Sequence, residues 1–229
     1  MVDVILVGDS MGMVLYGMDN TREITDEIMI RHASAVKKAS NKSLVFFDLP
    51  YSKKFSEEKI IKRTIQIFNQ TKCDGVKIEG NTELVDVIKY LTKKNIPVMA
   101  HVGLQPQKFS SASKFKIYGR KEDDLKNILN DCKALEKAGA ISLLLEGILT
   151  EIATQITFAS KIPTIGIGAS EYCDGQILVS EDMLGIFTEY HPKFVKKYAN
   201  LSSNIQNAIK RFSSEVNNNK FPNKKFRYD

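Results

Sequence analysis

The chain has 229 residues, of which 43% are hydrophobic and 26% charged, so it can bury a sizeable core and is not disordered by composition. No apolar run approaches the ~20 residues that cross a bilayer, and the N-terminus lacks the basic region of a signal peptide. The net charge of +6 comes from scattered lysines, which indicates a solvated surface, with attraction of an acidic substrate as the alternative.

Short runs of β-branched and other apolar residues recur along the chain, and each ends abruptly at a polar residue or a glycine. Runs of this length and composition predict buried parallel strands. In chain order they cover residues 4–7, 43–47, 75–78, 97–100, 141–145, 163–165 and 176–179.

Between these runs, apolar residues repeat at helical spacing. The repeats predict helices within residues 24–36, 56–68, 84–91, 125–135 and 152–159, and a last amphipathic helix at 204–216. Alternating strands and helices indicate a parallel sheet with right-handed crossovers. Because no long linker divides the chain, we expect one domain over residues 1–216 and a basic, flexible tail over 217–229.

The number of strands departs from a closed barrel. We count seven, and the chain begins inside the first of them, whereas a (β/α)₈ TIM barrel has eight. We therefore expect an α/β fold that is either a TIM barrel lacking its first β-strand unit or an open sheet.

The cysteines indicate the compartment. Cys73, Cys132 and Cys173 are widely spaced and form no Cys-x-x-Cys pair. Unpaired thiols are typical of a reducing environment rather than of a disulfide-stapled domain, so we expect a cytoplasmic protein.

Polar side chains gather where the predicted strands end. Parallel α/β folds place their chemistry at the carboxyl ends of strands, and five of the seven strands end in, or carry, an ionisable residue there. Clustered carboxylates repel one another unless a cation joins them, and oxygen ligands favour Mg²⁺ over Zn²⁺. The residues concerned are Asp9, Ser10, Asp48, Lys77, Glu79, His101 and Glu146.

Each of these residues also has a structural interpretation. An Asp after a strand is often a helix cap or a turn residue, and for Asp9 or Asp48 taken alone we weigh this role equally with a functional one. His101 taken alone is more often a core histidine. The Gly166–Gly168 loop is a weak phosphate signal that tight packing explains equally well. The coincidence of several such residues at one edge favours a functional site.

These motifs, in their order and spacing over about the first 200 residues, resemble the ketopantoate hydroxymethyltransferase family. The resemblance implies a (β/α)₈ barrel, dependence on Mg²⁺, and homo-oligomers without a nucleic acid or membrane partner. The matching segments are Val7-Gly-Asp-Ser-Met-Gly-Met-Val14, Phe47-Asp-Leu-Pro50, Gly75-Val-Lys-Ile-Glu-Gly80, His101-Val-Gly-Leu-Gln-Pro-Gln107, Tyr118-Gly-Arg120, Leu144-Leu-Glu146, Ile162-Pro-Thr-Ile-Gly-Ile-Gly168, Cys173-Asp-Gly-Gln-Ile-Leu-Val179 and Pro192-Lys-Phe-Val195.

The resemblance also implies a reaction. One carbon passes from 5,10-methylenetetrahydrofolate to 3-methyl-2-oxobutanoate and gives 2-dehydropantoate, a step of pantothenate synthesis. In this reaction Glu146 is implied as the catalytic base, and Lys77 as the group that stabilises the enolate oxygen.

The resemblance assigns binding roles to the remaining residues. Asp9 and Asp48 are implied as direct ligands of Mg²⁺, and Glu79 as the residue that completes the metal environment. The residues implied to bind the keto acid are Asp9, Ser10, Asp48, Lys77 and His101.

The chain departs from the family pattern at several places. Family members carry further residues, including a first barrel strand, before Gly8-Asp9-Ser10. Gly147-Ile-Leu149, Ser170 and Glu181 stand where the family often has Cys-Val-Pro, glycine and histidine. Two alternatives stay open: another Mg²⁺-dependent keto-acid lyase, of the phosphoenolpyruvate-mutase and isocitrate-lyase kind, and an inactive, truncated paralogue that acts as an assembly subunit.

Overall fold

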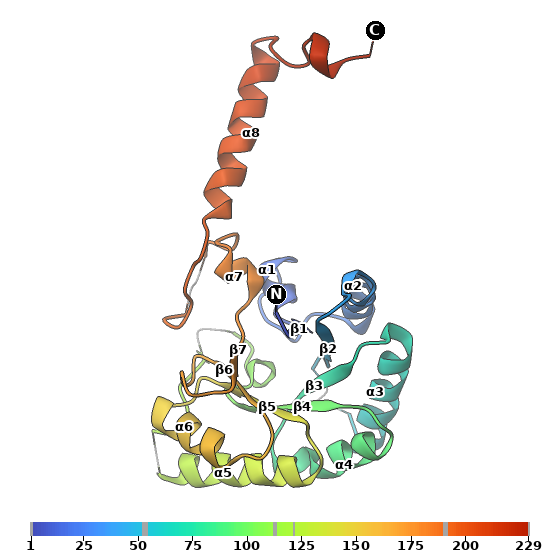
Figure 1. The fold of residues 1–229 in the computed structure, drawn as a ribbon, viewed down its shortest axis with the longest axis vertical. Helices are drawn as coiled ribbons and strands as arrows, with labels where there is room; N and C mark the ends of the chain where they lie inside the picture. Colours follow the sequence, from blue (N-terminus) through green and yellow to red (C-terminus); the bar gives the residue numbers. More distant parts are fainter. Residues whose placement is uncertain (1, 52–54, 112–113, 121, 190–191, 229) are drawn as a thin grey trace. The chain divides into compact units, whose positions relative to one another are not determined.

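The computed structural model describes residues 2–51, 55–111, 114–120, 122–189 and 192–228 (Figure 1). The chain forms two compact units, Met1–Ile177 and Leu178–Asp229. This division lies at a different place from the predicted boundary at residue 216, and the single domain stays a prediction. Residue 229 of the predicted tail lies outside the described residues.

A seven-stranded sheet forms the first unit, and each strand pairs in parallel with the next in the order β1-β2-β3-β4-β5-β6-β7. This confirms the parallel arrangement and the first six predicted strands, with small shifts at their ends; of the seventh, predicted at 176–179, only Gly175–Gln176 forms a strand. Strands added in chain order are typical of a barrel rather than of a doubly wound sheet. Among the described residues β1 and β7 are the two ends of a curled sheet, so a full eight-stranded barrel is not confirmed (Figure 1). The strands are Val4–Val7, Leu44–Asp48, Gly75–Glu79, Val98–Gly103, Ser142–Glu146, Thr164–Ile167 and Gly175–Gln176.

Five helices follow the strands, as predicted, and lie along the outer side of the sheet (Figure 1). Two of them begin at capped positions: Thr25 accepts a hydrogen bond from the amide of Ile28, and Ser56 accepts one from the amide of Lys59. Three single-turn elements, α1 (Met11–Val14), η1 (Thr82–Leu84) and η2 (Pro106–Lys108), have no periodic signal in the sequence. The five helices are α2 (Asp26–Ala39), α3 (Glu57–Thr71), α4 (Val85–Lys93), α5 (Glu122–Lys137) and α6 (Thr150–Ala159).

The two faces of the sheet bury different side chains, because successive residues of a strand point to opposite sides. On the outer face, Val45, Phe47 and their neighbours belong to the main apolar core, which also includes residues of the helices. On the inner face, Phe46, Met99 and Leu144 form a smaller apolar cluster. Cys73, Cys132 and Cys173 are free and buried.

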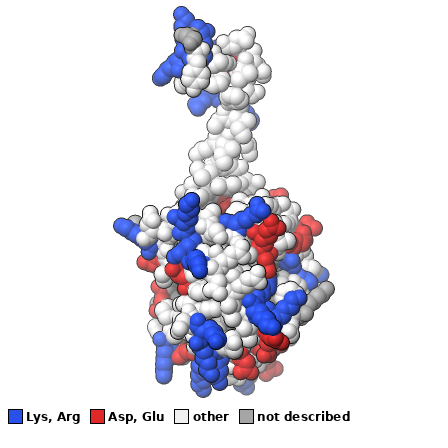
Figure 2. Space-filling model, turned by 90° about the vertical axis from the view of Figure 1, so that its right-hand side faces the viewer, with Lys and Arg blue, Asp and Glu red and all other residues white. Residues whose placement is uncertain are grey.

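The second unit contains α7 (Ser180–Met183), α8 (Leu201–Asn217) and η4 (Lys224–Phe226). Asn200 caps α8 by accepting a hydrogen bond from the amide of Ser203. Along α8, Ile205, Ile209 and Phe212 are about half exposed, at 48%, 61% and 56%. None of the described helices has both the length and the apolar character needed to cross a membrane. On the face drawn in Figure 2, basic and acidic side chains are interspersed over the first unit, whereas basic side chains gather at the far end of the second unit.

Candidate active site

Parallel register brings the predicted site residues to one edge of the sheet. Asp48, the last residue of β2, is paired with Lys77 of β3. Glu79, the last residue of β3, is paired with His101 of β4. Glu146 ends β5 opposite Gly103 of β4. Residues paired in neighbouring parallel strands share a face, so these side chains converge at the carboxyl ends of β2 to β5.

Lys77 is the buried cation at the centre of this group. Its ammonium lies 3.0 Å from Asp48 Oδ1 and 3.1 Å from Glu79 Oε1, and its side chain is only 4% exposed. Burial alone would lower the pKa of Lys77, but the nearby carboxylates raise it above its ordinary value. Lys77 therefore stays protonated, and it compensates part of the buried negative charge.

The pKa of Glu79 is lowered, although burial alone would raise it. Lys77 and His101 outweigh burial and lower this pKa to about 2. Its Oε2 accepts a hydrogen bond at 3.1 Å from the backbone amide of Gln107. Glu79 is therefore a permanent anion, and both of its oxygens already have protein partners.

Asp9 and Asp48 form a carboxylate pair whose charge is poorly compensated. The amide of Asp9 donates a hydrogen bond to Asp48 Oδ2 at 3.1 Å. Burial, and then the charge of Asp48, raise the pKa of Asp9 well above its usual value; burial also raises the pKa of Asp48, although Lys77 opposes this. Asp9, Asp48 and Glu79 thus face one ammonium, and a site with this excess of negative charge fits a bound cation.

The arrangement of these carboxylates limits how a metal ion could be held. Within the described part of the chain, no three His, Cys, Asp or Glu side chains are grouped as a metal site. The oxygens of Glu79 are taken up by Lys77 and by the Gln107 amide. Asp48 is also contacted by Lys77 and by the Asp9 amide, but its buried Oδ1 accepts no hydrogen bond from the described residues. Asp9 and Asp48 therefore fit Mg²⁺ better than Glu79 does, and the remaining ligands would come from the substrate or from water.

His101 lies between two carboxylates. Its Nδ1 is 3.4 Å from Glu79 Oε1 and its Nε2 is 3.2 Å from Glu146 Oε2, and the residue is 1% exposed. Burial and the positive charge of Lys77 lower the pKa of His101, but the two carboxylates outweigh them and raise it. His101 therefore connects Glu146 to the buried charges instead of filling an apolar core.

Glu146 is the most accessible carboxylate of the group. Its side chain is 15% exposed, compared with 2% for Asp48 and 3% for Glu79. Gly103, which has φ +95°, allows the backbone of Glu146 to approach, because a Cβ at Gly103 would lie 2.3 Å from the Glu146 carbonyl oxygen. Glu146 can thus meet a substrate while the other carboxylates stay covered.

Ser10 joins the same group through the tight turn after β1. It occupies the N-cap position of α1, yet its side chain makes no cap hydrogen bond. Ser10 Oγ and Asp48 Oδ2 both approach the place where a Cβ at Gly8 would stand, at 3.1 and 3.9 Å. The structure therefore gathers every predicted site residue at one edge.

Gln107 is a buried member of the site that the sequence did not single out. Its side-chain amide donates to Asp9 Oδ2 at 2.8 Å and to the Leu49 carbonyl at 2.9 Å. Its backbone amide also donates to Glu79, so Gln107 links residues at the ends of three strands, β1, β2 and β3. Gln107 lies in the single turn η2, which gives no periodic signal, and only its place in the His101–Gln107 motif could have indicated it.

Comparisons with known proteins show which family the chain resembles. The model of one protein family, ketopantoate hydroxymethyltransferase, matches residues 1–224. A protein of Rhizobium rhizogenes described as 3-methyl-2-oxobutanoate hydroxymethyltransferase is 44% identical over 96% of this chain and 81% of its own length. A Brucella suis protein of the same description is 41% identical over 96% of this chain and 80% of its own length.

A solved structure resembles the fold. A putative lyase/mutase from Burkholderia cenocepacia matches with a TM-score of 0.52 and 17% identity, over 94% of this chain and 75% of that chain. At this identity the likeness shows the fold alone, and it supports a barrel-like α/β architecture.

Proposed function

This chain belongs to the ketopantoate hydroxymethyltransferase family, and we propose that it transfers a hydroxymethyl group from 5,10-methylenetetrahydrofolate to 3-methyl-2-oxobutanoate. The product is 2-dehydropantoate, for pantothenate synthesis. The observation that carries the proposal is the buried group at the strand ends. An excess of carboxylates surrounds Lys77, and Glu146 is the carboxylate of this group that is most exposed to a substrate.

Asp9 and Asp48 would hold the metal ion that the family resemblance implies. Their excess negative charge supports this role. Glu79, which is bound to Lys77, would add negative charge to the metal environment without contacting the ion. When bound, Mg²⁺ supplies Lewis acidity toward the carboxylate and carbonyl oxygens of a 2-keto acid. Ser10, at the rim of the same turn, would contact the bound keto acid.

Glu146 would act as the base. It removes the C3 proton of 3-methyl-2-oxobutanoate, and His101, 3.2 Å from Glu146 Oε2, keeps the carboxylate in place. Lys77, held in its charged form, places positive charge where the enolate oxygen develops. One C–N bond of the methylene bridge breaks as the C3 carbon forms its bond to the methylene carbon, and water replaces the second C–N bond and provides the hydroxyl oxygen. Tetrahydrofolate leaves with the proton taken from C3 and one proton from water on its two nitrogens.

We also propose the larger features that the family resemblance implies. The order of the strands supports a (β/α)₈ barrel as the complete architecture, with one further strand between β7 and β1. The exposed apolar residues of α8 support a homo-oligomer. Nothing in the proposed reaction calls for a nucleic acid or a membrane, and its small-molecule substrates suit a cytoplasmic enzyme.

A transfer assay tests the function. The purified chain is incubated with 3-methyl-2-oxobutanoate, 5,10-methylenetetrahydrofolate and Mg²⁺, and 2-dehydropantoate is measured by mass spectrometry. We expect product only when all three are present, and none with 2-oxo acids that lack a C3 proton. A folded chain that makes no product would favour the non-catalytic subunit, and cleavage of the keto acid without folate would favour a lyase.

A further inference from the structure

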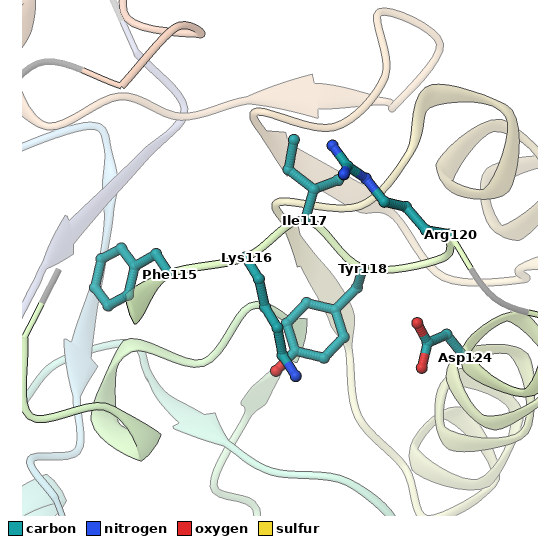
Figure 3. Close-up of a pocket in the computed structure, with 6 residues that line it drawn as sticks. All are labelled: Phe115, Lys116, Ile117, Tyr118, Arg120 and Asp124. Carbon is teal, nitrogen blue, oxygen red and sulfur yellow. The ribbon is translucent and has the colours of Figure 1, made fainter. Parts of the chain in front are cut away.

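A second hollow lies beside the proposed catalytic edge. It has a volume of about 580 Å³, within the roughly 300–1,000 Å³ of small-molecule sites. Most of its lining comes from the segment between η2 and α5, and one residue comes from α5 itself (Figure 3). The lining residues are Phe115, Lys116, Ile117, Tyr118, Arg120 and Asp124.

Backbone hydrogen bonds fasten this segment to the residues that follow Glu146. The amide of Tyr118 donates to the Gly147 carbonyl at 2.8 Å, and the amide of Leu149 donates to the Tyr118 carbonyl at 3.1 Å. Gly119, with φ +96°, lets the segment lie against α6, because a Cβ there would be 2.2 Å from a side-chain carbon of α6. The hollow therefore lies next to the proposed base, at the same edge of the sheet.

The lining combines positive charge with an aromatic surface. Lys116 and Arg120 are exposed, and neither forms an ion pair with a carboxylate whose side chain the structure describes. Among the lining residues that the structure describes, Asp124 is the one acidic residue, and it stands beside two cations. Figure 3 shows Lys116 beside the ring of Tyr118, and its ammonium lies 5.5 Å from the ring centroid.

We propose that this hollow binds the p-aminobenzoyl-glutamate half of the folate donor. The benzoyl ring would lie on Tyr118, and Lys116 and Arg120 would bind the glutamate carboxylates. This inference rests on the proposed function, which makes a folate the one-carbon donor. Ring stacking and charge-assisted hydrogen bonds are the ordinary means of holding such a group.

The chemistry of the donor sets its orientation. The transferred carbon is bonded to N5 and N10, and N10 is attached directly to the benzoyl ring. A benzoyl ring beside Tyr118 therefore places the reactive carbon near Glu146, because the backbone of Tyr118 is hydrogen-bonded to Gly147 and Leu149, which follow Glu146 in the chain. The pterin half is uncharged, whereas the glutamate tail is anionic, so the tail is the part that Lys116 and Arg120 would bind.

The test separates folate binding from keto-acid chemistry. The variants are Lys116→Gln/Arg120→Gln and Tyr118→Ala, with Tyr118→Phe as the conservative change and Lys114→Gln as a matched control, since Lys114 is an exposed lysine outside the lining. Calorimetric titration with mono- and triglutamyl tetrahydrofolate gives affinity, and Mg²⁺-dependent exchange of the C3 proton of 3-methyl-2-oxobutanoate, measured without folate, gives chemistry.

We expect the double variant to bind folate about 100-fold more weakly, because it loses two charge-assisted bonds and each is worth about a factor of ten. Tyr118→Ala should also weaken binding, while Tyr118→Phe and Lys114→Gln should not. The triglutamyl form should bind the wild type more tightly than the monoglutamyl form, and this gain should shrink in the double variant. The exchange rate should be unchanged in every variant.

Two results would overturn the inference. Folate affinity that is unchanged in the double variant would place the donor elsewhere, while wild-type exchange and product formation would leave the proposed function standing. Loss of exchange in a variant with a normal thermal unfolding curve would show that the hollow serves the keto acid. Conversely, a wild type that binds folate through Lys116 and Arg120 but makes no product would contradict only the proposed reaction.

Discussion

Replacing Gln107 with leucine tests whether this residue holds the carboxylate pair in place. The change keeps the approximate volume but removes the bonds to Asp9 Oδ2 and to the Leu49 carbonyl. A hydrogen bond to a charged acceptor contributes about 1.5–3 kcal/mol and one to a neutral acceptor about 0.5–1.5 kcal/mol. The free energy of unfolding should therefore fall by about 2–4.5 kcal/mol, which urea titration measures.

The same substitution should weaken the use of metal. A group that orients a metal ligand typically contributes about 10–100-fold to metal affinity or activity, so Gln107→Leu should need at least about tenfold more Mg²⁺ for half-maximal turnover. Gln70→Leu, on the exposed side of α3, is the matched control and should change stability by no more than about 0.5 kcal/mol. If both variants behave alike, Gln107 does not position Asp9.

Two further changes probe the scaffold. Gly103→Ala should lower turnover and stability far more than Gly17→Ala. Both glycines have positive φ, but only at Gly103 would a Cβ meet the backbone of Glu146. Equal effects of the two substitutions on turnover would contradict this. Burial would raise the pKa of Asp74, but hydrogen bonds from Lys37 hold it below its ordinary value. The stabilisation is thus present above the unfolded pKa near 4 and is lost as pH falls through the lower folded value. Urea titrations should therefore show that Asp74→Asn costs stability at pH 7 and progressively less as the pH falls below about 4; a cost independent of pH would refute this.

The strands and the edge that carries the site could be predicted from the sequence, because buried apolar runs and the polar residues that end them are local signals. Lys77 and Glu79 could be placed on one face from their spacing of two residues. The ion pair of Lys77 with Asp48 could not, since it depends on the register between β2 and β3. The last strand is shorter than predicted, because only Gly175 and Gln176 pair with β6.

The roles of the individual site residues were harder to predict from the sequence than their presence at one edge of the sheet. Glu79 reads in the sequence as one more carboxylate, and only the three-dimensional arrangement shows its oxygens already bound by Lys77 and Gln107. His101 reads as a core histidine, and its position between two carboxylates arises from three strands together. Such roles depend on contacts between residues far apart in the chain, which local patterns do not encode.

Exchange of the C3 proton of 3-methyl-2-oxobutanoate tests the central claim, that Glu146 is the base of a metal-assisted enolisation. The keto acid is incubated in D₂O with Mg²⁺ and without folate, and loss of the C3 signal is followed by NMR. The wild type and Glu151→Gln, an exposed control on α6, should exchange the proton. Glu146→Gln should exchange it about 10²–10⁴-fold more slowly while it still binds the keto acid. Near-normal exchange by Glu146→Gln would contradict the account.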